Sequence, residues 1–218
     1  MSVLPAELPL FPLPDHVLIP GLPQPYRVFE PRYLALVRGL LQASSAERWL
    51  AMPCLEPGWE ADYQGSPPVR PIAAAALVRR IEEGPGGEYH ILVEGIARIR
   101  LVEITSFQPY RLARAEALAD RPEVASAAAM QGLLDQLAGL GDRIDLDALG
   151  LSLLLAADSA HRLLVDRLGA LLIRVTDERQ RYLETVDLTA RIAQVRRELD
   201  GLSGDGGAMD RRWKPSTN

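Results

Sequence analysis

The chain has 218 residues with 48% hydrophobic and 24% charged side chains, a composition typical of a folded globular protein. Its formal net charge of −5 argues against nucleic acid as a partner, because neutralisation of phosphates dominates that kind of binding. Lys214 is the only lysine in the sequence. This excludes a P-loop nucleotide site and lysine-dependent catalysis, since each needs a lysine in a defined setting.

Candidate metal-binding and catalytic groups are few and scattered. Cys54 is the single cysteine, and the three histidines, His16, His90 and His161, show no paired spacing. The sequence holds no Gly-x-Ser-x-Gly motif, and Ser152 lies in an apolar stretch typical of helix packing. We therefore expect a non-catalytic protein with no metal and no other cofactor.

The ends of the sequence carry no pattern typical of targeting. Residues 1–13 contain three prolines and no basic residue, unlike a signal peptide. The apolar run 148–157 is about half as long as the ~20 residues of a membrane-spanning helix. We expect a cytoplasmic protein that has no membrane partner.

Residues 1–121 are expected to form a β-rich subdomain. Prolines punctuate residues 8–13, which predicts either an edge strand or a strand broken by bends, because proline cannot donate a hydrogen bond to a sheet. Further short strands are predicted at 17–19, 26–29 and 49–54. Pro31 is expected to begin a helix, where its missing N–H is no loss.

A loop and a hairpin follow in this half. Residues 56–68 are rich in glycine and proline and predict a long surface loop. Two strands, 72–83 and 88–94, are predicted to flank the turn 84–87, and Gly95 predicts either a second turn or a bulge. Alternation over 97–101 predicts a half-buried strand with Arg98 and Arg100 on its polar face, before a last strand at 109–118.

Residues 122–201 predict a helical bundle, and residues 202–218 a flexible tail. Helices are expected, in chain order, over 122–140, over 145–155, from 158 or 159, from 176 and over 187–200. Thr176 and Asp187 are the expected N-caps of the last two. Gly201 is the expected stop of the last.

Several segments, taken in order, resemble the N-terminal substrate-binding domain of Lon proteases. They are residues 8–14 (LPLFPLP), 17–21 (VLIPG), 28–33 (VFEPRY), 89–100 (YHILVEGIARIR) and 183–187 (LETVD) with Arg191. The resemblance implies an α+β chain with a PUA-like β pseudobarrel followed by a C-terminal helical bundle. In Lon this domain precedes an ATPase and a peptidase and helps to capture damaged or unfolded polypeptides. We expect a stand-alone member without those later domains.

The segment Phe29-Glu30-Pro31-Arg32-Tyr33 is the sharpest motif of the sequence. One interpretation is a polypeptide-binding lip, in which Glu30 and Arg32 grip a bound chain. The other is a structural corner, in which Phe29 and Tyr33 anchor the core, Pro31 starts the helix, and Glu30 and Arg32 fix each other. The second interpretation is favoured, because proline at a first helical position already explains the order of residues.

Trp59 and Tyr63 fall in the predicted loop 56–68, and with Met52 they form a second candidate binding group. Large apolar side chains on a loop can make an adaptable binding surface. The alternative is that the loop folds back as a structural lid. The preferred function is recognition of exposed apolar segments of unfolded or partly folded polypeptides. The alternatives are docking to another protein, such as a Lon-type protease, and a small-molecule-sensing PUA-like domain.

Overall fold

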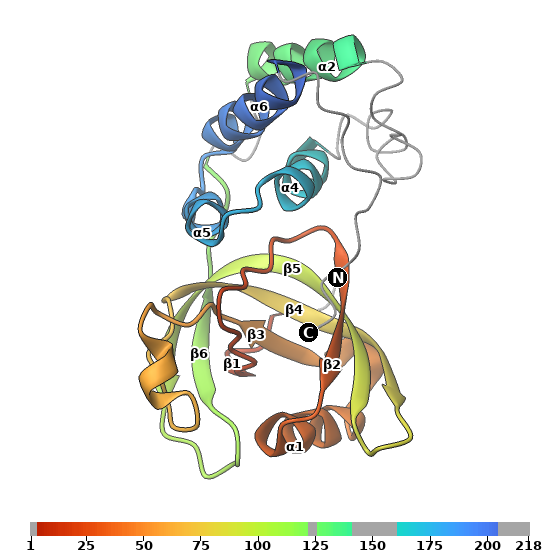
Figure 1. The fold of residues 1–218 in the computed structure, drawn as a ribbon, viewed down its shortest axis with the longest axis vertical. Helices are drawn as coiled ribbons and strands as arrows, with labels where there is room; N and C mark the ends of the chain where they lie inside the picture. The colour runs from red at the N-terminus through yellow and green to blue at the C-terminus, as the bar shows by residue number, and fades with distance from the viewer. Residues whose placement is uncertain (1–3, 122–125, 141–160, 205–218) are drawn as a thin grey trace. The chain divides into compact units, whose positions relative to one another are not determined.

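The structure, a computed structural model, describes residues 4–121, 126–140 and 161–204. The chain forms two compact units, which meet in the sequence between Leu118 and Ala119 (Figure 1). The predicted helix over 145–155, the caps at 158 or 159, and the tail from residue 205 onward lie outside the described residues. Among the helices that are described, none is long and apolar enough to cross a membrane.

In the described part of the first unit, six antiparallel strands form one sheet. They are β1 (Glu7–Pro9), β2 (Pro23–Val28), β3 (Trp49–Met52), β4 (Ile72–Glu83), β5 (Tyr89–Ile104) and β6 (Leu112–Ala117). The sheet order is β1-β6-β5-β4-β3, and β2 pairs with β5 outside this path. Parallel bridges from Leu10 to Ala51 and from Leu13 to Cys54 join the two ends of the sheet. The predicted α+β fold, a β pseudobarrel followed by helices, is confirmed.

Strand β5 is the longest element of the sheet, with 16 residues. Its first part pairs with β2, its last part pairs with β6, and β4 pairs with it from Tyr89 to Arg100. The strand continues through Gly95, so a turn at that glycine is wrong. The alternative, a bulge, is confirmed by a register shift, because Ala75 lies opposite Ala97 whereas Ala76 lies opposite Gly95.

Gly95 is needed for a close approach of two backbones. A Cβ atom at this position would lie 3.0 Å from the Cα atom of Pro20 and 3.2 Å from the carbonyl oxygen of Ile19. The Gly21 N–H also donates to the Gly95 carbonyl oxygen at 3.1 Å. The predicted strand at 17–19 is therefore wrong, because this segment is a buried, irregular crossing over β5 rather than a member of the sheet.

Two apolar clusters use alternate residues of β4. One contains Ala74, Ala76 and Val78 and packs against helix α1 (Pro31–Leu41), which Pro31 begins as predicted. The other contains Ala73, Ala75 and Leu77 and includes Leu8, Leu10, Trp49 and Ile99. β4 is buried on both faces from Ile72 to Val78, and of the two arginines predicted on a solvated face of the neighbouring β5, Arg100 is exposed. The expectation that Arg98 lies on such a face is wrong, since Arg98 is 4% exposed.

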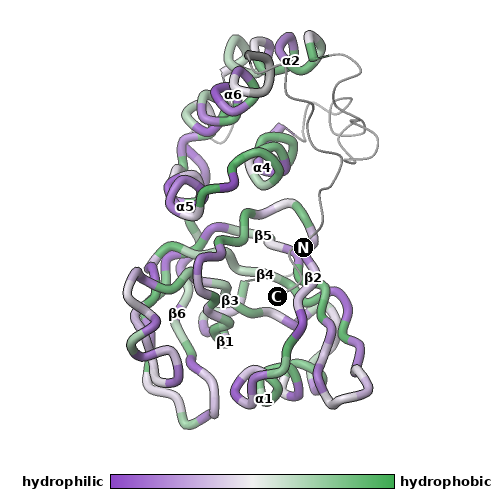
Figure 2. The backbone as a smooth tube through the Cα atoms, viewed as in Figure 1, coloured by the Kyte–Doolittle hydropathy of each residue, from purple (hydrophilic) through white to green (hydrophobic). Residues whose placement is uncertain are grey.

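Two short helices and the remaining boundaries complete the first unit. The 3-10 helices are η1 (Ser45–Glu47) and η2 (Trp59–Asp62), and η2 lies within the predicted loop. Strand β6 begins at Leu112, three residues after the predicted start at Pro109. Figure 2 shows hydrophobic segments on β4 and polar ones in the loop that carries η2, which agrees with a buried sheet and an exposed connection.

The second unit is helical in its described part. Its helices are α2 (Ala127–Leu140), α4 (His161–Leu172), α5 (Thr176–Glu184) and α6 (Leu188–Gly204). Asp187 caps α6 as predicted, since its Oδ1 accepts the N–H of Ala190 at 2.9 Å. Thr176 is the first residue of α5 and Val175 its N-cap. Helix α6 continues past the predicted stop at Gly201, because that glycine does not adopt the positive φ that ends a helix.

Among the described residues of this unit, Arg191 of α6 is the largest fully buried side chain, with 0% exposure. Its guanidinium forms ion pairs with Asp166 of α4 and, at 2.5 Å, with Asp120. The Tyr182 hydroxyl donates to the carbonyl oxygen of Val165 at 2.8 Å beside this pair. One cation therefore joins α6, α4 and the segment that enters the unit.

Replacing Gly95 with alanine should destabilise the first unit by about 2 kcal/mol, because the backbone of Pro20 cannot yield to the added methyl group. The control is Gly139→Ala in α2, where an added Cβ meets nothing within 4 Å. That variant should be neutral or slightly stabilising. Urea denaturation of both variants measures the difference, and equal midpoints would contradict the close approach.

Replacing Arg191 with methionine should cost about 3–5 kcal/mol, because two buried carboxylates lose their cation. The matched control is Arg197→Met, an exposed position of the same helix, which should change stability by less than about 0.5 kcal/mol. Far-UV circular dichroism during urea denaturation reports both. A variant at Arg191 as stable as the control would show that the ion pairs contribute nothing net.

Candidate functional site

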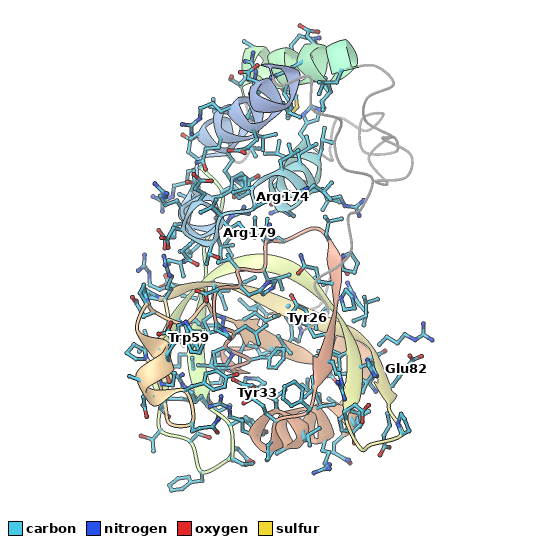
Figure 3. All side chains as sticks on the ribbon, in the orientation of Figure 1. Tyr26, Tyr33, Trp59, Glu82, Arg174 and Arg179 are labelled. Atoms are coloured by element: carbon cyan, nitrogen blue, oxygen red, sulfur yellow. The ribbon has the colours of Figure 1, made fainter. Side chains whose placement is uncertain are left out.

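A pocket with a volume of about 320 Å³ opens at the corner where β2 leads into α1. Its apolar lining comes from Phe11, Leu13, Pro14, Tyr26, Val28 and Tyr33. Figure 3 shows Tyr26 and Tyr33 reaching the region between β2 and α1 from these two elements. The pocket belongs wholly to the first unit, and its walls are continuous with the core cluster that α1 covers.

Edge-to-face aromatic contacts fix the inner wall of the pocket. The Phe11 ring lies 4.7 Å from the Tyr33 ring and 6.0 Å from the Tyr26 ring, and each pair meets at 89°. The Tyr33 hydroxyl donates to the carbonyl oxygen of Pro12 at 2.9 Å. Burial raises the pKa of Tyr33 well above its ordinary value, so the hydroxyl remains a neutral donor.

A second hydrogen-bonded group borders the pocket on the side of β2. Nε2 of His16 lies 2.7 Å from the hydroxyl oxygen of Tyr26, and that hydroxyl donates to Oε1 of Gln24 at 2.9 Å. Because the tyrosine proton goes to Gln24, the His16 contact is a donation from Nε2–H to the tyrosine oxygen. This arrangement keeps the Tyr26 ring against Phe11.

Phe29 lies at the mouth of the pocket and is 59% exposed. The prediction that it anchors the core is wrong. Successive residues of an extended strand face opposite ways, and Val28 is the one that turns into the core. The sequence held this signal, because Arg27 and Phe29 share one face of the predicted strand and arginine is mostly exposed in folded proteins. The Arg27 guanidinium carbon lies 6.0 Å from the Phe29 ring centre.

Glu30 and Arg32 are fixed to each other and to the loop 56–68. The Arg32 Nε–H donates to Oε2 of Glu30 at 3.0 Å, and the Tyr63 hydroxyl donates to Oε1 of Glu30 at 2.6 Å. Both carboxylate oxygens of Glu30 therefore have partners within the protein. Burial and the bond to Glu30 raise the pKa of Tyr63, which keeps its hydroxyl protonated as a donor.

The guanidinium of Arg32 is held between two aromatic rings. Its carbon atom lies 4.8 Å from the Tyr33 ring centre and 5.1 Å from the Tyr63 ring centre. Its Nη atoms donate to the carbonyl oxygens of Tyr63 at 3.2 Å and of Gly65 at 3.4 Å. Burial opposes its charge, yet Tyr33 and Glu30 raise the pKa of Arg32. These contacts fit the structural interpretation of the motif.

The loop 56–68 forms a fixed wall of the pocket. Tyr63 lines the pocket, and the Trp59 ring packs on it with centres 5.3 Å apart. The Arg111 Nη1–H donates to the carbonyl oxygen of Pro67 at 2.8 Å and anchors the far end of the loop. Met52, the third predicted member of this group, lies in the core at 3% exposure, because β3 is buried along its whole length. Its assignment to a binding surface is wrong.

The chemistry that the pocket offers is binding of an apolar group. Its polar members include His16 and Glu30, which are held by hydrogen bonds, and Arg27, which pairs with Glu88 at 3.6 Å. They surround an aromatic floor. Within residues 4–121, 126–140 and 161–204, no group of three His, Cys, Asp or Glu side chains lies close enough together to hold a metal ion. Cys54 is buried.

Comparison with known proteins gives a match over most of the chain. A family model described as the ATP-dependent protease La (LON) substrate-binding domain matches residues 7–201. The Lon protease of Desulfosudis oleivorans is 23% identical over 90% of this chain and 24% of its own length. The human peroxisomal Lon protease homolog 2 is 30% identical over 62% of this chain and 16% of its own length. The chain thus spans about a quarter or less of these relatives.

Two solved structures have a similar fold. The N-terminal domain of the Mycobacterium avium complex Lon protease superposes with a TM-score of 0.68, 16% identity and coverage of 89% of this chain and 98% of that one. A Lon N-terminal domain protein from Xanthomonas campestris gives a TM-score of 0.58, 21% identity and coverage of 88% and 97%. At these identities the likeness concerns the fold.

Replacing Arg32 with alanine should release the loop 56–68 while leaving the fold intact, because the guanidinium holds two carbonyl oxygens of that loop. Hydrogen–deuterium exchange at Gly65 and Ser66 should become at least about ten-fold faster. The control is Arg38→Ala, an exposed position of the same helix. Unchanged exchange in the Arg32 variant would refute the anchoring role.

Proposed function

Because the chain belongs to the Lon substrate-binding domain family, we propose that it binds polypeptides, holding exposed apolar segments in the pocket between β2 and α1. The exposure of Phe29 is the observation that carries this proposal. A phenylalanine 59% exposed at the rim of an aromatic pocket forgoes burial, which is worth about 1.5–3 kcal/mol for such a side chain. A bound apolar group would cover Phe29 and fill the pocket together.

The engagement of Glu30 and Arg32 favours apolar over charged anchor groups. Both side chains are already bonded within the protein, so a ligand that needed either charge would compete with an existing contact. An apolar group bound against the aromatic floor would compete with no such contact. We therefore propose that Phe29 and the pocket floor, and not the Glu30–Arg32 pair, form the centre of polypeptide binding.

A non-catalytic role for this chain is part of the same proposal. The matched family model describes a substrate-binding domain, and Lon proteases are the curated relatives. We propose that bound polypeptides are clients in the context of a Lon-type protease. Recognition of an unfolded chain needs surface and no reacting group, and the pocket supplies such a surface.

Phe29→Ala should weaken binding of a labelled, permanently unfolded polypeptide by at least about ten-fold, as expected for loss of a central aromatic contact. Fluorescence anisotropy with the purified chain measures the affinity, and the same polypeptide in folded form is the reference ligand.

The matched control for this experiment is Phe107→Ala. Phe107 is a fully exposed phenylalanine of the same unit that does not line the pocket, so its loss should leave the affinity unchanged. Equal affinities of both variants and the unaltered chain would place binding elsewhere. Failure of the unaltered chain to bind at ~100 μM would refute polypeptide capture.

A further inference from the structure

Strand β2 leaves one edge without a neighbouring strand in the described sheet, since it pairs with β5 alone. The β4–β5 hairpin decides which backbone groups lie on that edge. The Gly84 N–H donates to the Glu88 carbonyl oxygen at 2.8 Å, so these two residues form a hydrogen-bonded pair. Hydrogen-bonded and non-hydrogen-bonded pairs alternate along antiparallel strands. His90 therefore directs its N–H and C=O groups to β4, whereas its neighbours Tyr89 and Ile91 direct theirs to β2.

The register between β5 and β2 then assigns the outer edge of β2. Tyr26 lies opposite Ile91, so its backbone groups bond to β5. Pro25 and Arg27, one residue to either side, direct theirs away from β5. The two prolines of the strand, Pro23 and Pro25, agree with this assignment, because a residue without an N–H loses no ladder hydrogen bond at an outward position.

The outer edge offers three hydrogen-bonding groups to an extended backbone. They are the N–H and C=O of Arg27 and the C=O of Pro25, and both residues are exposed. Within residues 4–121, 126–140 and 161–204, no hydrogen bond from outside the β2–β5 ladder reaches these groups. Arg27 also lines the pocket, together with Val28 and Phe29, so the free edge and the apolar floor are continuous.

We propose that a polypeptide binds here as an added strand, in which an extended segment pairs with the outer edge of β2 at Pro25 and Arg27 and places an apolar side chain in the pocket. This inference rests on the proposed polypeptide-binding function and adds the conformation in which the ligand is held. Alternate side chains of a strand face opposite ways, so those on the side of Tyr26 and Val28 enter the pocket. An unfolded segment suits this mode, because its N–H groups are not already paired within secondary structure.

The balance of donors and acceptors favours a foreign strand over a second copy of β2. The outer edge carries three carbonyl groups, at Pro23, Pro25 and Arg27, but only the N–H group of Arg27. A segment without proline supplies an N–H to each carbonyl oxygen that it reaches. A second copy of β2 brings the same two prolines and therefore leaves carbonyl oxygens unpaired. The prolines also keep the donor-bearing edge short, which limits pairing between edges of two copies.

A scan of N-methylated peptides tests the backbone pairing. The probe is a labelled heptapeptide in which serine alternates with leucine, phenylalanine and leucine, and each derivative carries one N-methyl group at a different amide. An amide that faces β2 loses its hydrogen bond when it is methylated. Affinity should therefore fall about five- to ten-fold at alternate positions and change little between them. Anisotropy titrations with the unaltered full chain measure these affinities, so the scan depends on the folding of no variant.

Arg27→Pro tests the protein side of the pairing, because it removes the outward N–H as Pro23 and Pro25 already do. The matched variant is Arg27→Ala, which loses the same side chain and keeps the N–H. Affinity for the unmethylated peptide should be about five-fold lower in the proline variant than in the alanine variant. Far-UV circular dichroism of the two should agree, since pairing with β5 does not use this N–H.

Losses that alternate along the peptide, with weaker binding by the proline variant, would support the added strand. Equal affinities of all methylated peptides would overturn backbone pairing and leave apolar capture standing. Equal affinities of the proline and alanine variants would overturn the assignment to β2. A dimer of the unaltered chain in sedimentation equilibrium that Arg27→Pro dissociates would assign the edge to a second copy and overturn the proposal. Failure of every peptide to bind would overturn the proposed function together with this inference.

Discussion

The crossing of residues 19–21 over Gly95 is the constraint on which the β unit depends. Strand β5 pairs with β2 along its first half and with β6 along its second. The segment 19–21 passes over β5 where these partners change. Only a residue without a Cβ atom allows Pro20 to lie this close. The one-residue bulge at the same place re-aims the strand, so a sheet of modest length can curl into a pseudobarrel.

The pocket is a consequence of how the chain leaves this crossing. Pro23 and Pro25 place β2 outside the main sheet path, where it pairs with β5 alone, and Pro31 begins α1 three residues after the strand ends. The short corner allows only Val28 to turn inward, and Phe29 is left at the surface. The loop 56–68 forms the remaining wall of the pocket, because Arg32 and Arg111 bind carbonyl oxygens of that loop.

Local signals predicted most elements, and they failed where a contact distant in sequence decides. Pro31 and Asp187 start their helices as expected, because capping is a property of neighbouring residues. Val17 to Ile19 has the apolar β-branched character of a strand, yet the approach to Gly95 makes it an irregular crossing. The sequence leaves two interpretations of Glu30 and Arg32, a binding lip or a structural corner. The choice between them depends on the position of Tyr63, which lies 31 residues further along the chain than Arg32.

The basic residues of this chain are almost all arginine, and in both units some of these arginines hold the structure together. Of the 24 basic residues, 23 are arginine, and several of them satisfy carbonyl oxygens rather than solvent. Arg32 and Arg111 do so in the loop 56–68, and Arg179 donates to the carbonyl oxygens of Ala170 and Ile173 at the end of α4. A planar guanidinium with five N–H donors can stack on a ring while it bonds two acceptors in its own plane, a geometry that a tetrahedral ammonium does not offer. These three arginines therefore act inside the structure, where they hold the loop 56–68 against the first unit and complete the end of α4, and they present little charge to a ligand.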